Sequence, residues 1–164
     1  MKAIGVAMLL ILASANVASA QRRPMSSQVA TVAQLYRDFA WEAVIEEPSF
    51  ESLGLLDQPR SILHRYFDDR LTELWLADRE CQVKTREVCR VDFSPMWSAQ
   101  DPVASGLKIV QTADSSRVRV TFRSYRNQTV ELTYSMARTE RGWRITDIRR
   151  GAEWSLRQLL ERKL

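Results

Sequence analysis

Apolar residues recur at three- and four-residue steps in two segments of the first half of the chain. The first segment, from Val29 to Val44, predicts an amphipathic helix of about five turns. Glu46-Glu47-Pro48 should end this helix, because the residue before a proline avoids the helical region. The second segment predicts a helix with Asp57 or Gln58 near its cap and Pro59 at its first position, running to about Arg79.

In the second half of the chain the period of the pattern changes to two. Apolar and polar residues alternate over 117–123 and 130–136, as is typical of antiparallel strands with one face on a core and the other in water. Further strands are predicted at 107–112 and 143–148, and Gly151 then separates a short final helix. The predicted fold class is α+β, with two amino-terminal helices packed on a four-stranded antiparallel sheet and a short carboxy-terminal helix.

Residues 81–102 join the predicted helices to the predicted strands. They show no sustained period and contain Pro95 and Pro102, which predicts a long loop with a short helix near Trp97. Loops of this length inside a domain are more often functional, or held in place, than idle.

Cys81 and Cys89 are the two cysteines of the chain. In an oxidising compartment two nearby cysteines usually pair, so a structural disulfide is the favoured interpretation. The alternative is a redox or metal pair. The spacing matches neither C-x-x-C nor a zinc motif, and His64 is the single histidine that could assist.

Residues 1–20 have the layout of a secretory signal peptide. Lys2 supplies a positive start, residues 4–13 form an apolar stretch, and Ala18-Ser19-Ala20 is a small-x-small cleavage site. The apolar stretch is shorter than the roughly 20 residues of a membrane-spanning helix. We therefore expect a periplasmic or secreted protein that begins at Gln21.

The part of the chain after the leader predicts a soluble protein. No lipobox cysteine follows the apolar stretch, so neither a lipid anchor nor a transmembrane segment after signal cleavage is expected. Residues 21–28 are polar and should form a loose lead-in to one domain of residues 29–164.

The formal net charge of the 164-residue chain is +4, and removal of the leader makes it weaker still. A weakly basic exported chain without aromatic residues between its strand arginines fits a nucleic-acid partner poorly, and none is predicted. The sequence contains no recognisable metal or cofactor motif, so no cofactor is predicted either.

Four motifs carry a resemblance to a known family. They are Val32-Ala33-Gln34-Leu35-Tyr36, Leu71-Thr72-Glu73-Leu74, Asp92-Phe93-Ser94-Pro95 with Ala99-Gln100-Asp101, and Gly142-Trp143-Arg144-Ile145-Thr146-Asp147-Ile148. Together they resemble a bacterial exported family of unknown function, often lipoproteins, with a cystatin-like or nuclear-transport-factor-like fold. The resemblance covers most of the mature chain and implies a curved sheet that encloses a conical pocket with the helices. It implies no catalytic residue, and this chain lacks the acylated cysteine of many relatives.

Several polar residues could reach such a pocket. The candidates are His64, Tyr66, Asp68, Asp101, Tyr134 and Asp147. His64 and Asp68 are four residues apart on the second predicted helix, a spacing that suits either a general base oriented by a carboxylate or an idle surface pair, which we favour.

The other two carboxylates have structural explanations as well. Asp101, with help from Gln100, is expected to tether the loop before the sheet. Asp147 interrupts the alternation of its strand, which suggests a β-bulge; bulges occur near sites and also at sheet edges.

One predicted strand carries Arg117, Arg119 and Arg123 on a single face, and Arg144 could join them from another strand. Such a face could bind an anion or a partner. The favoured alternative is a solvated face in which Arg119 pairs with Glu131.

Trp97 and Trp154 are the tryptophans expected to be most exposed. They are candidate partner contacts, against the alternative of local packing over the core.

The function best supported by these patterns is a non-catalytic exported binding module. It would contact an envelope protein or a small anionic or apolar ligand through the arginine face or the Trp97–Asp101 loop. One alternative is a small enzyme with His and Asp acid–base groups in the pocket. The other is an immunity-type inhibitor of a secreted toxin.

Overall fold

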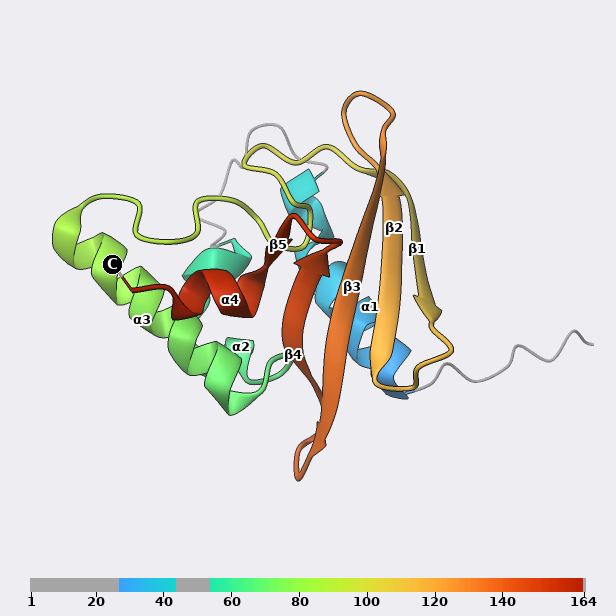
Figure 1. Cartoon of the computed structure of the whole chain (residues 1–164), viewed down its shortest axis with the longest axis horizontal. Coiled ribbons are helices and arrows are strands. Elements are labelled where there is room, and N and C mark those ends of the chain that lie inside the picture. Colours follow the sequence, from blue (N-terminus) through green and yellow to red (C-terminus); the bar gives the residue numbers. More distant parts are fainter. Residues whose placement is uncertain (1–26, 44–53, 164) are drawn as a thin grey trace, which may run out of the picture.

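The structure, a computed structural model, describes residues 27–43 and 54–163 of the chain (Figure 1). The leader, most of the expected lead-in and Glu46-Glu47-Pro48 lie outside the described residues. Within the described part, no helix combines the length and the apolar character that a membrane crossing requires.

The elements follow one another in helix-then-strand order. The helical elements are α1 (Ser27–Phe39), the 3-10 helices η1 (Ala40–Ala43) and η2 (Leu55–Asp57), α2 (Arg60–Leu63), α3 (Asp69–Thr85) and α4 (Leu156–Glu161). The strands are β1 (Ser105–Gln111), β2 (Arg117–Arg123), β3 (Thr129–Thr139), β4 (Gly142–Arg150) and β5 (Trp154–Ser155).

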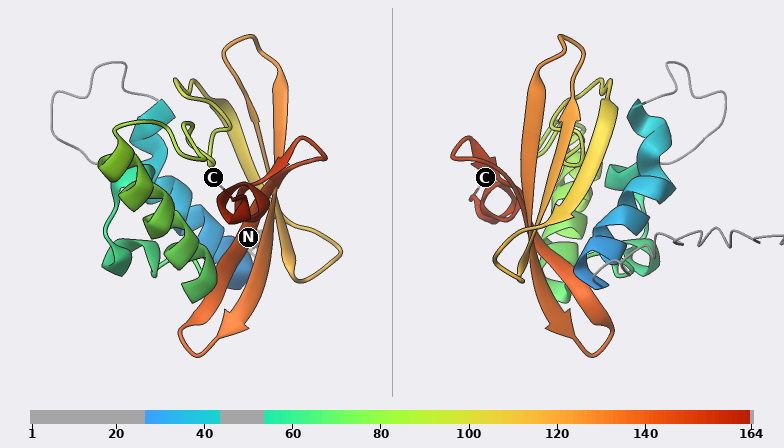
Figure 2. Two further views of the ribbon diagram at one scale, coloured as in Figure 1. Left: turned by 60° about the vertical axis from the view of Figure 1, so that its left-hand side comes forward. Right: turned by 90° about the vertical axis from the view of Figure 1, so that its right-hand side faces the viewer.

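The five strands form one antiparallel sheet in the order β1-β2-β3-β4-β5. Helices α1 and α3 cover one face of this sheet, and α4 packs against both α3 and β4 (Figure 2). The predicted α+β class is confirmed, but the sheet has five strands rather than four. The additional strand, β5, follows the turn at Gly151 and has only two residues, too few to show a periodic pattern.

The first predicted helix is nearly as expected. It is α-helical from Ser27 and continues as the 3-10 helix η1 after Phe39. Ser27 and Gln28 therefore belong to the helix rather than to a loose lead-in. The Gln28 side chain donates a hydrogen bond to the Ser115 carbonyl (3.1 Å) in the turn before β2.

The second predicted helix is divided into η2, α2 and α3, which corrects the continuous helix expected from 57 to 79. The break occurs because the chain at Phe67 pairs with β4. Ile145 donates its N–H to the Tyr66 carbonyl (2.8 Å) and accepts at its own carbonyl from the Asp68 N–H (3.0 Å). The Asp68 carboxylate then accepts the Leu71 N–H (2.8 Å) and starts α3 as its cap.

The loop before the sheet begins later than expected, because α3 extends to Thr85 and ends at Arg86, which has a left-handed backbone conformation. Around Trp97 the chain forms a tight turn instead of the predicted short helix. Ser94 donates its N–H to the Ala99 carbonyl (2.8 Å), and Ser98 donates its N–H to the Ser94 carbonyl (2.7 Å).

The predicted bulge in β4 is confirmed. The register between β3 and β4 shifts between Ser135 and Met136, so that Thr146 is left without an opposing residue. The shift places Ile145 and Ile148 on the buried face although they are three residues apart.

Large side chains fill the space between the helices and the sheet. The fully buried ones include Tyr36, Leu63, Tyr66, Phe67, Leu71, Met96, Leu132, Tyr134, Ile145 and Ile148. Trp97 is 5% exposed and packs edge-on against both Tyr36 and Phe122. This region of the interior is therefore a packed core.

Candidate functional site

A cleft of about 590 Å³ lies where the loop before β1 meets the 3-10 helices η1 and η2. Its volume falls in the range of about 300–1,000 Å³ that is usual for ligand sites. The lining residues are Trp41, Glu42, Ala43, Gly54, Leu55, Leu56, Asp57, Asp92, Phe93, Ser94, Gln100, Asp101, Pro102 and Val103. The lining thus combines an apolar surface with carboxylates, and no lysine or arginine is among its described residues.

Two of the carboxylates are held by the walls of the cleft. Glu42 accepts the Leu55 N–H at one oxygen (2.6 Å) and the Ser94 hydroxyl at the other (2.7 Å). It thereby joins η1 to η2 and to the loop before β1. Asp92 accepts a hydrogen bond from the Gln100 amide (2.7 Å) across the turn of the same loop.

The carboxylates of Asp57 and Asp101 are exposed and accept no hydrogen bond from any other described residue. Within the described chain, none of Glu42, Asp57, Asp92 and Asp101 forms an ion pair with an arginine or lysine. No ion pair within the described residues therefore neutralises their negative charge.

Several carboxylates elsewhere in the described chain lie close to an arginine. Asp38 lies near Arg65, Asp78 near Arg90, Asp147 near Arg149, and Glu161 between Arg70 and Arg157. In the part of the chain that the structure describes, the cleft brings together four carboxylates that form no ion pair with an arginine or lysine.

The four cleft carboxylates come from η1, η2 and the loop before β1. Among the residues that the structure describes, no three His, Cys, Asp or Glu side chains are arranged to hold a metal ion.

Of the predicted binding residues in the loop, Gln100 and Asp101 line the cleft and Trp97 does not. The prediction that Trp97 is exposed is wrong, because the Ser94–Ala99 turn directs its ring into the core. Trp154 is partly buried and packs edge-on against Phe93.

His64 and Asp68 do not form the expected pair on one helix face. His64 ends α2 and lies beside Asp69 (Nε2–Oδ1 3.4 Å) and Arg141 (Nδ1–Nη1 3.0 Å). Asp68 is used as the cap of α3. Because α2 ends at Leu63 and α3 begins at Asp69, residues 64 and 68 do not lie on one helix, and their four-residue spacing no longer places them on a common face.

Tyr66 and Tyr134 belong to the packed interior. Tyr66 donates to the Asp38 carboxylate, and the Tyr134 hydroxyl lies 2.9 Å from that of Tyr36. Burial raises the pKa of the Tyr134 phenol above its ordinary value. Burial also raises the pKa of Tyr36, and the nearby Tyr134 adds to that rise.

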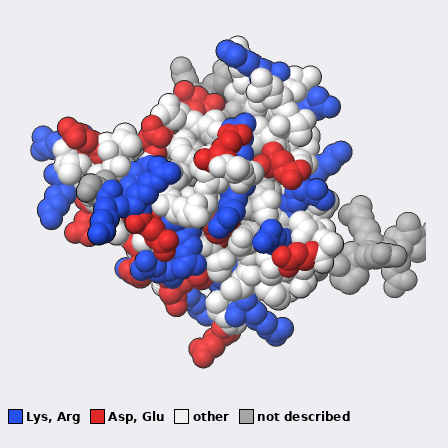
Figure 3. Space-filling model, viewed as in Figure 1, with Lys and Arg blue, Asp and Glu red and all other residues white. Residues whose placement is uncertain are grey.

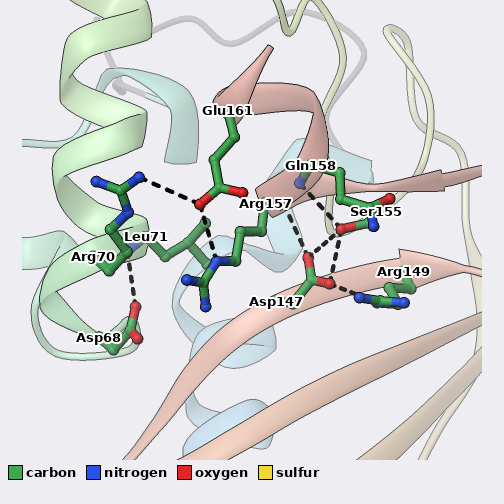
Figure 4. A network of polar contacts seen from close by, with 9 residues as sticks. All are labelled: Asp68, Arg70, Leu71, Asp147, Arg149, Ser155, Arg157, Gln158 and Glu161. Atoms are coloured by element: carbon green, nitrogen blue, oxygen red, sulfur yellow. Dashed lines mark hydrogen bonds and ion pairs between the residues drawn. The ribbon is translucent and has the colours of Figure 1, made fainter.

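Asp147 is the centre of a polar network between β4 and α4 (Figure 4). Its carboxylate is 5% exposed and accepts hydrogen bonds from the Ser155 hydroxyl (2.8 Å), the Arg157 N–H (3.0 Å) and Arg149 (2.6 Å). Glu161 accepts from Arg157 (3.3 Å), and this hydrogen bond lowers the pKa of Glu161. Asp147 therefore anchors the start of α4 and does not face a pocket.

Arg117, Arg119 and Arg123 share the exposed face of β2, as predicted, but each has a partner nearby. Arg117 lies 3.1 Å from Asp114, Arg119 lies 3.9 Å from Glu131, and Arg123 donates to Asn127 (3.0 Å). Figure 3 shows basic and acidic side chains interspersed over this side of the molecule.

Arg144 does not join the arginines of β2. Strand β3 separates β4 from β2, and the Arg144 guanidinium donates to the carbonyls of His64 (3.0 Å) and Trp143 (2.8 Å).

The Cys81 and Cys89 sulfurs lie at bonding distance, with their Cα atoms 6.2 Å apart. The pair joins the end of α3 to the loop that leads to the cleft. A second tie lies close by, where buried Asp78 accepts from the Val91 N–H (3.4 Å), Gln82 (2.9 Å) and Arg90 (3.3 Å).

Glu42, Asp57 and Asp92 were not predicted as site residues. Asp92 lies in a motif used for the family resemblance, and that motif was the one available signal. Glu42 and Asp57 come from two helical ends that the chain brings to the same cleft, and no local spacing indicates it.

Comparison of the chain with family models, with curated proteins and with solved structures finds no significant match.

Proposed function

We propose that this protein is an exported, non-catalytic binding module that holds a basic side chain of a partner protein in its cleft. The observation that carries the proposal is the set of cleft carboxylates that no arginine or lysine of the described chain neutralises. Like charges that share a partly enclosed space repel each other, so a cation that enters relieves this repulsion.

The apolar part of the lining supports a lysine or arginine side chain rather than a small inorganic cation. Trp41, Leu56 and Phe93 offer surface to the methylene groups of such a side chain. The aromatic rings also favour a nearby cationic head. Asp57 and Asp101, which accept no hydrogen bond within the described chain, are the expected acceptors.

The proposal that the protein is exported rests on the sequence of residues 1–20, which lie outside the described part of the chain. The cysteine pair at bonding distance is in keeping with an oxidising compartment. The arrangement of helices on one face of an antiparallel sheet is in keeping with the resemblance to exported cystatin-like domains.

The alternative of a small enzyme gains no support from the expected acid–base residues. His64 lies beside Asp69 and Arg141, Asp68 caps α3, and Asp101 lines the cleft. These three residues therefore do not meet as a catalytic group.

Site-specific crosslinking in the cells that produce the protein tests the proposal. Val103→p-benzoylphenylalanine places a photoreactive group at the cleft, and Val83→p-benzoylphenylalanine, on exposed α3, is the matched control. We expect a product for the cleft position alone, with the crosslinked partner residue close in sequence to a lysine or arginine. A toxin as partner would make the module an immunity-type inhibitor.

Removing the negative charges of the cleft distinguishes specific binding of a basic side chain from a crosslink that forms by chance proximity. Adding Asp57→Asn and Asp101→Asn to the cleft crosslinker should abolish the product. A product that persists in the neutralised variant, or that forms equally at position 83, would overturn the proposal.

A further inference from the structure

Strand β1 is the edge of the sheet beside the cleft. It pairs only with β2 in the described chain, and no backbone hydrogen bond joins residues 105–110 to any other described element. The right-hand view of Figure 2 faces this edge. Its outward N–H and C=O groups are a template on which another extended chain can add.

The cleft leads directly into this edge. Pro102 and Val103 line the cleft, and β1 begins at Ser105. An extended segment rises about 3.3 Å per residue, so a few residues suffice to pass from the cleft to the paired part of β1.

Exposed apolar side chains mark the same path. Val103 is 51% exposed, Leu107 39% and Val110 44%. They lie within eight consecutive residues of a chain whose other apolar strand residues are mostly buried. Val110 lies opposite Arg119 on the exposed face of the regular part of β1, so an added strand with apolar residues at alternate positions would place them beside Val110.

The edge also carries features that oppose unspecific pairing. The register with β2 shifts between Ser105 and Lys108, where Gly106 has a positive φ of 64°, and it is regular from Lys108 to Gln111. A bulge and a lysine are devices that protect edges from unspecific strand addition. A segment that adds to β1 must therefore gain part of its binding affinity from contacts outside the strand pairing, and the adjacent cleft can supply such contacts.

We infer that the partner presents an extended peptide segment. Its basic residue enters the cleft, and the following residues add as a strand to β1 from Lys108 onward. This inference rests on the proposed function of the cleft and specifies the chemistry of the partner. The positive charge of Lys108 disfavours a second basic residue directly beside it, so the basic residue belongs at the cleft end.

Selection of displayed random peptides of about twelve residues on the mature protein tests the inference. We expect enrichment of peptides with one lysine or arginine near an alternating apolar stretch. The tightest synthetic peptide should slow hydrogen exchange of the β1 amides by about tenfold or more. N-methylation of its alternate amides should weaken binding by about tenfold, because it removes the donors of the added strand.

A matched pair of variants locates the added strand on the protein. Val110→Lys should weaken binding of this peptide, whereas Val83→Lys, a substitution at an exposed valine on α3, should not.

Two other kinds of result would overturn the inference. Strand addition would be overturned by a peptide whose binding requires Asp57 and Asp101 but neither slows hydrogen exchange of the β1 amides nor is weakened by N-methylation. That result would leave the cleft proposal standing. Failure to enrich any peptide, or enrichment of peptides without basic residues, would overturn the inference as well. The cleft proposal is then judged separately by the binding of a small guanidinium compound.

Discussion

The hydroxyl groups of Tyr36 on α1 and Tyr134 on β3 lie 2.9 Å apart in the packed space between helix and sheet. Tyr36 also donates to the Met96 carbonyl (2.7 Å), and since a phenol carries one hydrogen, Tyr134 is the donor between the two rings. This chain of hydrogen bonds holds helix, sheet and loop together in the interior.

Replacement of Tyr36 by phenylalanine should lower the stability of the fold more than replacement of Tyr134. Tyr36→Phe leaves both the Met96 carbonyl and the Tyr134 hydroxyl without a partner and should lower the free energy of unfolding by about 1–3 kcal/mol. Tyr134→Phe leaves the bond to Met96 intact and should cost about 0.5–1.5 kcal/mol. Urea unfolding measures both values, with exposed Tyr125→Phe as the control. Equal losses for the two core variants would contradict this hydrogen-bond order.

The same pair predicts a loss of stability at alkaline pH. Burial raises the pKa of both phenols above their ordinary value, so the folded state keeps protons that the unfolded chain releases. The stabilisation is therefore fully present below about pH 10 and is lost as the pH rises above it, by up to about 1.4 kcal/mol per pH unit for each tyrosine. Urea unfolding from pH 8 to 11 measures the slope. It should be smaller in the Tyr36→Phe/Tyr134→Phe double variant, and an unchanged slope would refute the assignment.

Asp147 should be the most sensitive carboxylate of the carboxy-terminal region. Asp147→Ala removes the acceptor for Ser155, the Arg157 N–H and Arg149 in a buried position, and should cost about 2–4 kcal/mol. Glu131→Ala removes the exposed partner of Arg119 and should change stability by no more than about 0.5 kcal/mol. Thermal and urea unfolding compare the two variants. A small loss for Asp147→Ala would show that α4 does not depend on this network.

The cysteine pair should stabilise the fold without being needed for the cleft. Closing the short loop between Cys81 and Cys89 contributes about 2–3 kcal/mol on the chain-entropy account, and Cys81→Ser/Cys89→Ser should lose this amount. The contacts of Asp78 with Gln82, Arg90 and the Val91 N–H keep the loop in place. We therefore expect the double variant to bind a cleft ligand as the parent does. Loss of binding in a folded variant would assign the disulfide a direct role in shaping the cleft.

Local patterns in the sequence predict the strands well and the helices less well. Alternation identified β2 and β3, because one face of each is buried and the other is in water. The break between α2 and α3 arises from pairing of Phe67 with Ile145, a contact across 78 positions that no local pattern contains.

The candidate site illustrates the same limit. Asp101, before Pro102, was expected to tether its loop with help from Gln100, but in the described chain Gln100 alone does so, by donating to Asp92. Both residues line the cleft, whereas Glu42 and Asp57 reach it from separate helical ends. Trp97 was misplaced because the turn between Ser94 and Ala99, which the sequence does not reveal, turns its ring inward. The arginines of β2 were correctly placed on one exposed face, yet their neighbouring acceptors were only partly foreseen.

The most direct test of the cleft is an NMR titration of the mature protein with butylguanidinium, which resembles the end of an arginine side chain, and with pentanoate as the matched anion. We predict saturable shifts of the backbone amides of Gly54, Leu55, Gln100 and Asp101 for butylguanidinium alone. In Asp57→Asn/Asp101→Asn the affinity should fall by about tenfold, as expected for the loss of charge-assisted hydrogen bonds. Absence of saturable shifts at these amides, or equal shifts with pentanoate, would contradict the account that the cleft binds a basic side chain.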